Sequence, residues 1–395
     1  MLELLFLLLP IAAAYGWYMG HRSAKKDQEE ISNKLSRDYM TGVNFLLSNQ
    51  QEKAVDLFLK MLEKQESENA IDNSSQFEAE LTLGNLFRSR GEVDRALRIH
   101  QNIDNNPNYT YEQKLLTKQQ LAKDFMFIGF LDRAEKLYQE LSEEPDYAEN
   151  ALHELANIYQ RMKEWHKAIE VGERYRKLTQ SENNIALSHY YCEFALQQEQ
   201  EQKNRQQIIS YLTKALIVSP NCVRASMILA EEYALQNDYE QAIKTLEHIA
   251  EQNTAYVSEA LPALVEYYQH LPTQLHEFEL FLVRLQQQKA SSAVVLTLTH
   301  YIEQKSGTAI AKEHLYHQLE KQPTMRIFHR FIQYQIDEVE EGSGKESLKL
   351  LYNIVDERLK QGFKYRCHHC GFQSHKLIWQ CPSCRHWETI TPIDN

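Results

Sequence analysis

Between residues 38 and 336, apolar positions follow the three- and four-residue spacing of helices that bury one face. A longer pattern runs through them: a small residue, an aromatic residue three positions later, and an alanine twelve positions after the small one. Such recurrence is typical of tetratricopeptide repeats, units of about 34 residues that each form two antiparallel helices. Five stretches show it: Gly42–Phe45–Ala54, Gly84–Phe87–Ala96, Ala122–Phe125–Ala134, Ala156–Tyr159–Ala168 and Ala230–Tyr233–Ala242. The pattern predicts an all-α superhelix of stacked helix pairs.

Close packing explains the pattern. A small residue facing alanine lets the paired helices approach, while the aromatic residue plugs the next repeat. Between Cys192 and Ile208 the step is four residues longer, which predicts a repeat with a lengthened turn. Residues 258–334 continue as helices with a weaker pattern. We therefore expect about six clear and two or three degenerate repeats, with a concave face that holds an extended peptide or a partner's helix.

The array is followed by three further segments. Residues 337–347, DEVEEGSGKES, are acidic and contain glycine, and they predict a hinge. Residues 348–362 predict a last helix, and residues 363–395 predict a small separate domain.

The chain begins MLELLFLLLPIAAAYGWYMG, uncharged from Leu4 to Met19. Residues 1–20 predict a transmembrane anchor, and residues 21–37 a polar linker. A cleaved signal peptide is the alternative, but Glu3 stands where such peptides carry a positive charge. Arg22 and Lys25 follow the apolar run, which indicates a single-pass protein with its body in the cytoplasm.

Composition argues against two classes of protein, nucleic-acid-binding proteins and disulfide-rich scaffolds. The formal charge of −12 argues against wholesale nucleic-acid binding. Six cysteines in 395 residues are too few for a disulfide scaffold. We interpret Cys192 and Cys222 as small core residues.

The other four cysteines form two C-x-x-C pairs separated by ten residues: Cys367, Cys370, Cys381 and Cys384. Two such turns present four thiolates as a tetrahedron, so we predict one bound ion, iron or zinc. Gly371 suits the left-handed turn after the first pair, whereas Arg385 occupies the matching place after the second. A complete cysteine set leaves no ligand position for the nearby histidines, His368, His369, His375 and His386.

Three uses of this metal module compete. A nucleic-acid ribbon would need a larger basic footprint than its four cations, Lys364, Arg366, Lys376 and Arg385, although Trp379 and Trp387 could stack on bases. An electron carrier would need a redox partner, and the sequence has no flavin motif or second cluster motif. We favour a structural clamp, since a domain of about 30 residues is too small to fold without help.

Enzymatic interpretations fail on spacing. GSGKES at 342–347 lacks the first glycine of a phosphate loop and has Glu346 where Ser or Thr is required. His276-Glu277 and His153-Glu154 both lack the second histidine of a zinc-protease helix. His314 and His317 lie one helical turn apart but have no third ligand in the sequence pattern. We expect no catalytic activity.

The combination of anchor, repeats and cysteine pairs resembles the lipopolysaccharide assembly protein B family over essentially the whole chain. The resemblance is carried by MLELLFLLLPIAAAYGWYMG, LSRDYMTGVNFLLSNQQEKAVDLF, LTLGNLFRSRGEVDRALRIHQ, QPTMRIFH and YRCHHCGF…CPSCR. Residues 64–76 and 197–207 match least well.

The resemblance implies an inner-membrane adaptor that restrains lipopolysaccharide synthesis. Its expected partners are the membrane AAA zinc protease and the lipid A-committing deacetylase, whose degradation it promotes, together with other lipopolysaccharide synthesis or transport proteins. It also implies a rubredoxin-like domain that packs on the repeats, with the four cysteines as ligands and iron as the usual metal. A homodimer is possible. The alternative from another class is a redox- or metal-sensing module whose four-cysteine site controls partner binding.

Overall fold

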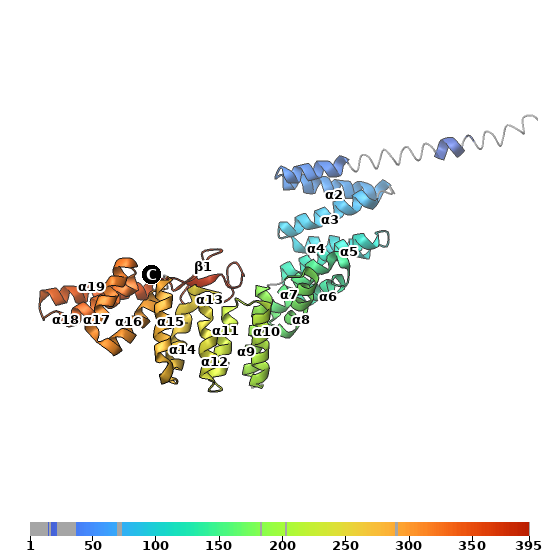
Figure 1. The fold of residues 1–395 in the computed structure, drawn as a ribbon. Coiled ribbons are helices and arrows are strands. Elements are labelled where there is room, and N and C mark those ends of the chain that lie inside the picture. The colour runs from blue at the N-terminus through green and yellow to red at the C-terminus, as the bar shows by residue number, and fades with distance from the viewer. Residues whose placement is uncertain are drawn as a thin grey trace, which may run out of the picture. The chain divides into compact units, whose positions relative to one another are not determined.

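The computed structural model describes residues 15, 17–21, 37–68, 73–181, 184–201, 204–288 and 291–394. They are almost entirely helical and form two compact units, Met1–Ile158 and Tyr159–Asn395 (Figure 1). The predicted anchor at 1–20 and linker at 21–37 lie mostly outside the described residues. Within the described part of the chain, no helix has both the length and the apolarity needed to cross a membrane.

The first unit is a run of helices. A helix over residues 37–47 is followed by α2 (Gln51–Glu68), α3 (Asn73–Ser89), α4 (Val93–Asn105), α5 (Tyr111–Ile128), α6 (Leu131–Leu141) and α7 (Pro145–Met162), the last of which continues into the second unit. Successive helices from α2 to α6 are in contact, as the repeat pattern predicts.

Burial explains the repeat pattern. The alanines twelve positions after the small residue have no exposed surface: Ala54, Ala96, Ala134, Ala168 and Ala242. Gly42 and Gly84 were predicted to face this alanine. In the structure each lies against the side chain four residues after the alanine, one helical turn further along the same helix. A Cβ on Gly84 would lie 2.3 Å from the His100 ring, and one on Gly42 would lie 2.6 Å from the Phe58 ring. Glycine is needed there because the partner side chain occupies the space of a methyl group.

Buried polar groups link neighbouring repeats of the first unit. The Asp124 carboxylate of α5 bonds the Arg88 guanidinium of α3 at 2.8 Å and His100 Nδ1 of α4 at 2.5 Å. Asp124 and His100 have fully buried side chains. A buried carboxylate must be paired, so this contact specifies how the three helices align.

The second unit continues the array. Its helices are α8 (Trp165–Thr179), α9 (Ile185–Gln200), α10 (Arg205–Val218), α11 (Val223–Ala234), α12 (Tyr239–Glu247), α13 (Ile249–Gln252), α14 (Val257–Gln269), α15 (Leu275–Gln287), α16 (Ser292–Ser306), α17 (Thr308–Lys321), α18 (Met325–Glu338) and α19 (Ser343–Gln361), with short 3-10 turns η1 (Thr254–Tyr256) and η2 (Pro272–Gln274). The weakly patterned segment 258–334 is therefore helical, as predicted.

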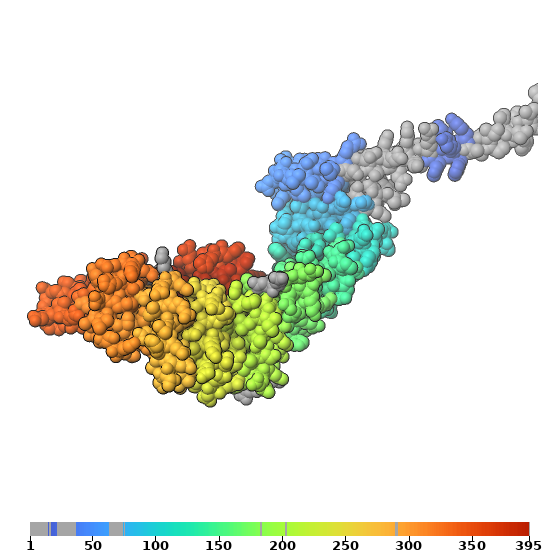
Figure 2. All heavy atoms as spheres, in the orientation of Figure 1, coloured from blue at the N-terminus to red at the C-terminus, as the bar shows by residue number. Residues whose placement is uncertain are grey.

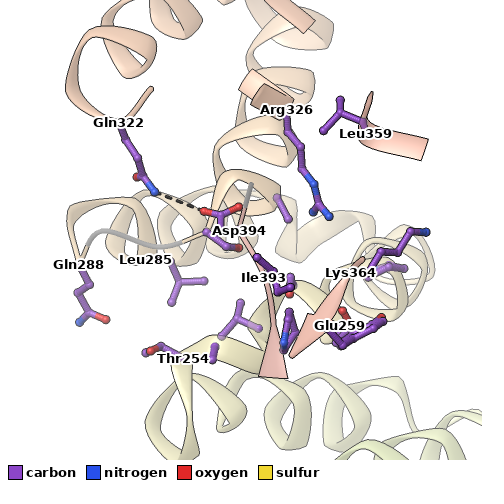
Figure 3. A pocket seen from close by; sticks show the side chains of 18 of the residues that line it. Thr254, Glu259, Leu285, Gln288, Gln322, Arg326, Leu359, Lys364, Ile393 and Asp394 are labelled. Atoms are coloured by element: carbon purple, nitrogen blue, oxygen red, sulfur yellow. Dashed lines mark hydrogen bonds between the residues drawn. The ribbon is translucent and has the colours of Figure 1, made fainter. Parts of the chain in front are cut away.

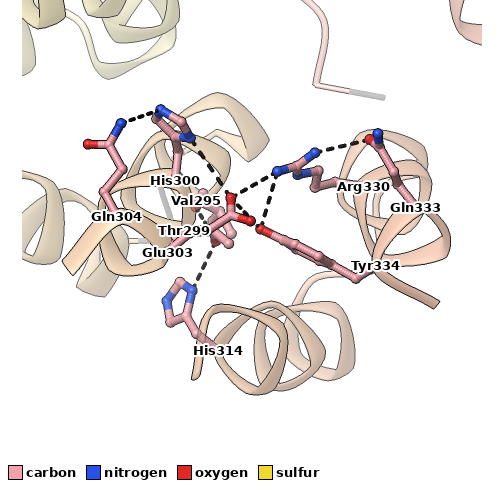
Figure 4. Close-up of polar contacts among 9 residues, drawn as sticks. All are labelled: Val295, Thr299, His300, Glu303, Gln304, His314, Arg330, Gln333 and Tyr334. Carbon is pink, nitrogen blue, oxygen red and sulfur yellow. Dashed lines mark hydrogen bonds and ion pairs between the residues drawn. The ribbon is translucent and has the colours of Figure 1, made fainter. Parts of the chain in front are cut away.

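Polar contacts also align α16, α17 and α18 (Figure 4). Glu303 accepts hydrogen bonds from Arg330 Nη2 at 3.0 Å and from the Tyr334 hydroxyl at 2.9 Å. His314 lies 3.0 Å from the Thr299 hydroxyl and 2.9 Å from the Gln286 amide. Within the described residues, His314 belongs to no group that could hold a metal. Its role is to join helices.

The last helix differs from the prediction. It begins at Ser343, inside the segment 337–347 expected to be a hinge, and not at 348. Gly342 has extended backbone angles and precedes the first helical residue. Lys345 pairs with Glu341 at 3.0 Å across this junction, so its acidic and basic residues stabilise the first turn.

The C-terminal residues form a small antiparallel sheet in the order β2-β1-β3. Its strands are β1 (Tyr365–Cys367), β2 (Gln373–Ser374) and β3 (Ile390–Pro392). Tyr365 pairs with Ser374 on one side and with Pro392 on the other. The sheet lies against the array, where Figure 2 shows the module in red beside the yellow and orange helices.

Candidate metal centre and its docking interface

The four predicted ligands come together at the end of the sheet. All four Sγ atoms lie within 4.8 Å of one another. Cys367 Sγ is 3.8 Å from Cys384 Sγ, and Cys370 Sγ is 3.6 Å from Cys381 Sγ. A tetrahedral ion with metal–sulfur bonds of about 2.3 Å requires sulfur–sulfur edges of about 3.8 Å. The four cysteines therefore cluster as a metal-binding set.

The two C-x-x-C turns share one backbone pattern. The Gly371 amide donates to the Cys367 carbonyl at 3.0 Å, and the Arg385 amide donates to the Cys381 carbonyl at 2.8 Å. Each turn is closed in the same way, since the Cys367 and Cys381 amides donate to carbonyls five residues later. Equivalent turns on opposite sides give the near-tetrahedral arrangement.

The turns differ in the residue that adopts the left-handed conformation. Gly371 has φ of 77°, and Arg385 has φ of 59°. A side chain at positive φ costs about 1 kcal/mol or more relative to glycine. Arg385, in the place that glycine takes in the first turn, therefore puts backbone strain into the second turn.

Backbone amides stabilise the thiolates. Burial opposes ionisation of Cys367, but the Thr389 hydroxyl at 3.3 Å and the amides of Cys370 and His369 outweigh it and lower its pKa to about 6. The Phe372 amide is the main cause of the lowered pKa of Cys370. Cys384 behaves differently. The His386 amide favours its thiolate, but burial and the neighbouring thiols outweigh this effect and raise the pKa of Cys384 to about 12. Four thiolates this close together need a cation to balance their charge, which is the chemistry of a metal site.

Burial of the ligands is uneven. Cys367 and Cys381 are buried in the module's core, whereas Cys370 is exposed and Cys384 is half-exposed. His369 and His386 stack over this open side with ring centroids 4.0 Å apart. They form a second donor group with Cys384, whose ligand atoms lie within 4.8 Å of one another.

Both module tryptophans pack on the array. Trp387 stacks on the buried His189 of α9 with ring centroids 4.4 Å apart, and its indole N–H donates to Gln160 at 3.2 Å. Trp379 stacks on Tyr256 of η1 at 5.4 Å and packs against the array core. Base stacking by these rings belonged to the nucleic-acid alternative that the sequence analysis disfavoured, and in the structure they hold the module to the helices.

Hydrogen bonds extend this docking interface. The Tyr256 hydroxyl donates to the Ile390 carbonyl at 2.8 Å, and the Tyr365 hydroxyl donates to Glu259 at 2.9 Å. Asp394 accepts from the Ser292 amide at 3.0 and 2.8 Å, at the N-terminus of α16. These hydrogen bonds join the module to η1, α14 and α16 of the second unit.

His189 of α9 contacts three residues of the module: Trp379, Trp387 and Glu388. Its Nε2 is 3.0 Å from a carboxylate oxygen of Glu388. The donor atoms of His189, Glu388 and Cys222 all lie within 4.8 Å of one another. Burial lowers the pKa of His189, an effect that exceeds the opposing attraction of Glu388. Sequence reasoning missed His189, Tyr256 and Glu259, because one polar or aromatic residue on a helix carries no sign of a distant partner.

Family models match part of the repeat array and the metal module. A zinc-ribbon model described as a rubredoxin metal binding domain matches residues 365–392, and a tetratricopeptide repeat model matches residues 151–180. These matches agree with the cysteine cluster and the paired helices.

Named relatives match over the full chain. The lipopolysaccharide assembly protein B of Haemophilus influenzae is 61% identical over 395 residues, covering 100% of this chain and 99% of its own length. The protein of the same name from Escherichia coli K12 is 45% identical over 393 residues, covering 100% and 98%.

Solved structures give weaker likenesses. A tetratricopeptide repeat protein from Parabacteroides merdae is 12% identical, covering 67% of this chain and 97% of its own, with a TM-score of 0.36. MamA protein is 18% identical, covering 46% and 93%, with a TM-score of 0.31. Scores this low support no further inference.

Proposed function

Because the chain belongs to the lipopolysaccharide assembly protein B family, we propose that it is a non-enzymatic adaptor in lipopolysaccharide assembly. In this proposal it restrains synthesis by bringing the lipid A-committing deacetylase to the membrane AAA zinc protease for degradation. It acts at the inner membrane as a single-pass protein with its body on the cytoplasmic side. Sequence similarity to two named relatives over the full length supports a role in lipopolysaccharide assembly. The family resemblance supports the proposed partners and the membrane location.

The observation that carries an adaptor role is the docking of the metal module on the array. Trp379, Trp387 and Asp394 each contact array helices directly. Because the module is too small to keep its shape without metal, loss of the metal would also change the adjacent array surface. The array supplies the protein-binding face, and the metal-bound module braces one end of it.

The decisive experiment replaces Cys381 and Cys384 by serine in cells and follows decay of the deacetylase after translation is stopped. We expect a longer deacetylase lifetime at unchanged adaptor abundance. Cys192→Ala, which removes a buried thiol outside the module, is the matched control and should leave the lifetime unchanged. Normal turnover in the double variant would refute a need for the module.

Tethering is a separate part of the proposal. An anchor in the plane of the protease raises the effective concentration without adding contacts. Deleting residues 1–20 should leave a folded body with weakened activity in the same turnover assay. Full activity at native expression would refute the tether. Site-specific crosslinking from the array in cells would identify the partners, including other lipopolysaccharide synthesis or transport proteins or a second copy of the chain.

A second candidate function is redox or metal sensing, favoured by the exposure of Cys370 and the half-exposure of Cys384. We propose iron in the four-cysteine site, on the family resemblance, with zinc as the alternative. Elemental analysis of anaerobically purified protein distinguishes the two metals. A sensor predicts an iron spectrum that bleaches reversibly and releases the partner as it bleaches, and a redox-inert zinc would exclude a redox sensor.

A further inference from the structure

Three side chains of metal-binding types, outside the four-cysteine set, meet where the metal module packs on the array. His189 comes from α9, and Cys222 directly precedes the first residue of α11. Glu388 comes from the loop between the second C-x-x-C turn and β3. Their donor atoms, an imidazole nitrogen, a thiol sulfur and a carboxylate oxygen, all lie within 4.8 Å of one another. Only the docked module completes this group.

The group is buried and held in place. Cys222 and the side chain of His189 have no exposed surface, and the side chain of Glu388 is 18% exposed. The Trp387 ring stacks on the imidazole with centroids 4.4 Å apart, and Trp379 lies against it at 6.1 Å. Exposed donors often gather without an ion, but buried polar groups need partners.

Protein atoms do not satisfy this group fully. The Glu388 carboxylate contacts His189 Nε2 at 3.0 Å and has no other hydrogen-bond or ion-pair partner in the described part of the chain. The Nδ1 atom of His189 is buried and, among the same residues, has no hydrogen-bond partner. Burial lowers the pKa of His189, so at neutral pH the ring is uncharged and does not neutralise the carboxylate.

The charges around the group favour a divalent cation. Arg224 acts on His189, but its guanidinium is balanced by Glu193 at 2.9 Å. The carboxylate of Glu388 therefore leaves one negative charge uncompensated. A divalent cation that replaces the thiol proton of Cys222 brings the total to zero, which keeps the cost of burying the charges low.

The ligand types and spacing suit zinc. Thiolate, imidazole and carboxylate are its usual protein ligands, at bond lengths of about 2.0–2.3 Å. Tetrahedral coordination then places the ligand atoms about 3.2–3.8 Å apart. The nitrogen–oxygen distance of 3.0 Å is close to this range. The Cys222 sulfur, within 4.8 Å, needs to move by roughly 1 Å at most. Water takes the fourth position, as in other zinc sites with three protein ligands.

Elsewhere the contact between module and array is not closed. A cavity of about 920 Å³ lies between β1, the residues around β3 and helices α14 to α16, α18 and α19, with Arg326 and Lys364 on its wall (Figure 3). None of the metal-binding groups among the described residues lies on this wall. The docked position of the module therefore depends on separate contacts, and an ion at His189 would add one of them.

We propose that His189, Cys222 and Glu388 bind a zinc ion, separate from the ion of the four-cysteine site, that links the array to the module. Binding forms zinc–nitrogen, zinc–sulfur and zinc–oxygen bonds, releases the Cys222 thiol proton to solvent and transfers no electrons. Two ligands belong to the array and one to the module, so the ion joins the two regions directly. The site goes beyond the adaptor function, since neither the protease nor the deacetylase takes part.

Metal stoichiometry of the full, reduced chain in phosphatidylcholine nanodiscs tests the proposal. After dialysis against micromolar free zinc, elemental analysis should find two zinc ions per chain. Cys222→Ala and Glu388→Gln should each bind one ion fewer. Cadmium NMR of the cadmium-loaded chain should show two resonances, of which Cys222→Ala retains only that of the four-sulfur site. Helical circular dichroism checks folding, and Glu388→Gln provides the same test if Cys222→Ala does not fold.

Two matched controls should keep both ions. Cys192→Ala removes another buried thiol, which belongs to no metal-binding group of the described residues. His369→Gln with His386→Gln removes the histidines of the exposed donor group beside the four-cysteine site. A single ion in the unaltered chain would overturn the proposal. So would two ions in the folded Cys222→Ala and Glu388→Gln variants, or loss of the second ion in the double histidine variant.

Discussion

The repeat array and the metal module bury their interiors by different means. The array stacks helices through alanines that have no exposed surface and through large aromatic side chains such as Phe58 and Tyr268. The module has four buried apolar core residues, of which Cys367 and Cys381 belong to the metal-binding set. The array is therefore stabilised by many distributed contacts, whereas the module depends on one centre.

Removing that centre should have the largest effect. Cys381→Ser with Cys384→Ser should unfold the module and leave the helices folded, since structural metal binding of this kind contributes on the order of 10 kcal/mol. Metal content by elemental analysis, protease sensitivity of residues 363–395 and helical circular dichroism measure the two regions separately. Loss of the helical signal together with the module would show that the array depends on the metal as well.

The array should respond most to overpacking. Gly84→Ala places a methyl group 2.3 Å from the His100 ring, and we expect it to lower the free energy of unfolding by about 1–3 kcal/mol. Thermal or denaturant unfolding followed at the helical signal measures this. Gly344→Ala, where no atom lies within 4 Å of the added Cβ, is the control and should not destabilise the chain. Equal effects at both glycines would contradict close packing at Gly84.

Acid should weaken the contact between the two regions at His189. Burial holds the pKa of His189 below its ordinary value, with Arg224 acting in the same direction and Glu388 and Glu193 opposing. The unfolded chain therefore takes up this proton first, so stability should fall as the pH drops below about 6.5, by less than about 1.4 kcal/mol per pH unit. Melting temperature against pH measures it.

His189→Gln should flatten that pH dependence. His276→Gln is the matched control, because this histidine side chain is 74% exposed, and its slope should equal that of the unaltered chain. An unchanged slope in His189→Gln would assign the acid sensitivity to other groups.

The smallest expected effect lies within the module. Arg385→Gly relieves a side chain held at φ of 59° and should stabilise the metal-bound module by about 0.5–1 kcal/mol. Gly371→Ala makes the opposite change at φ of 77°, with no atom within 4 Å of the new Cβ, and should destabilise it. The rate of metal release to a chelator compares the two variants. Faster release from Arg385→Gly would show that the arginine contributes more than strain.

Much of the architecture could be predicted from local pattern. In each of the five repeat stretches the alanine twelve positions after the small residue is buried as the spacing predicted, and the four cysteines cluster as their spacing required. The start of α19 at Ser343 was not predicted, because an acidic segment with two glycines is typical of a hinge. The ion pair between Lys345 and Glu341 and the helical turn that follows it are visible only in the structure. The roles of Trp379 and Trp387 were also missed, since an aromatic ring gives no indication of which surface it will contact.

The sequence by itself determined the helical periodicity, the repeat step and the metal-binding cysteines, because these depend on residues close together in the chain. Tertiary structure alone decided where the module docks, since Trp387 meets His189 and Asp394 meets Ser292 across long separations in the chain. It also created the cavity containing Arg326 and Lys364, whose walls come from helices and strands that no local pattern connects. Such contacts depend on the shapes and charges of whole surfaces, and these exist only once the helices have packed.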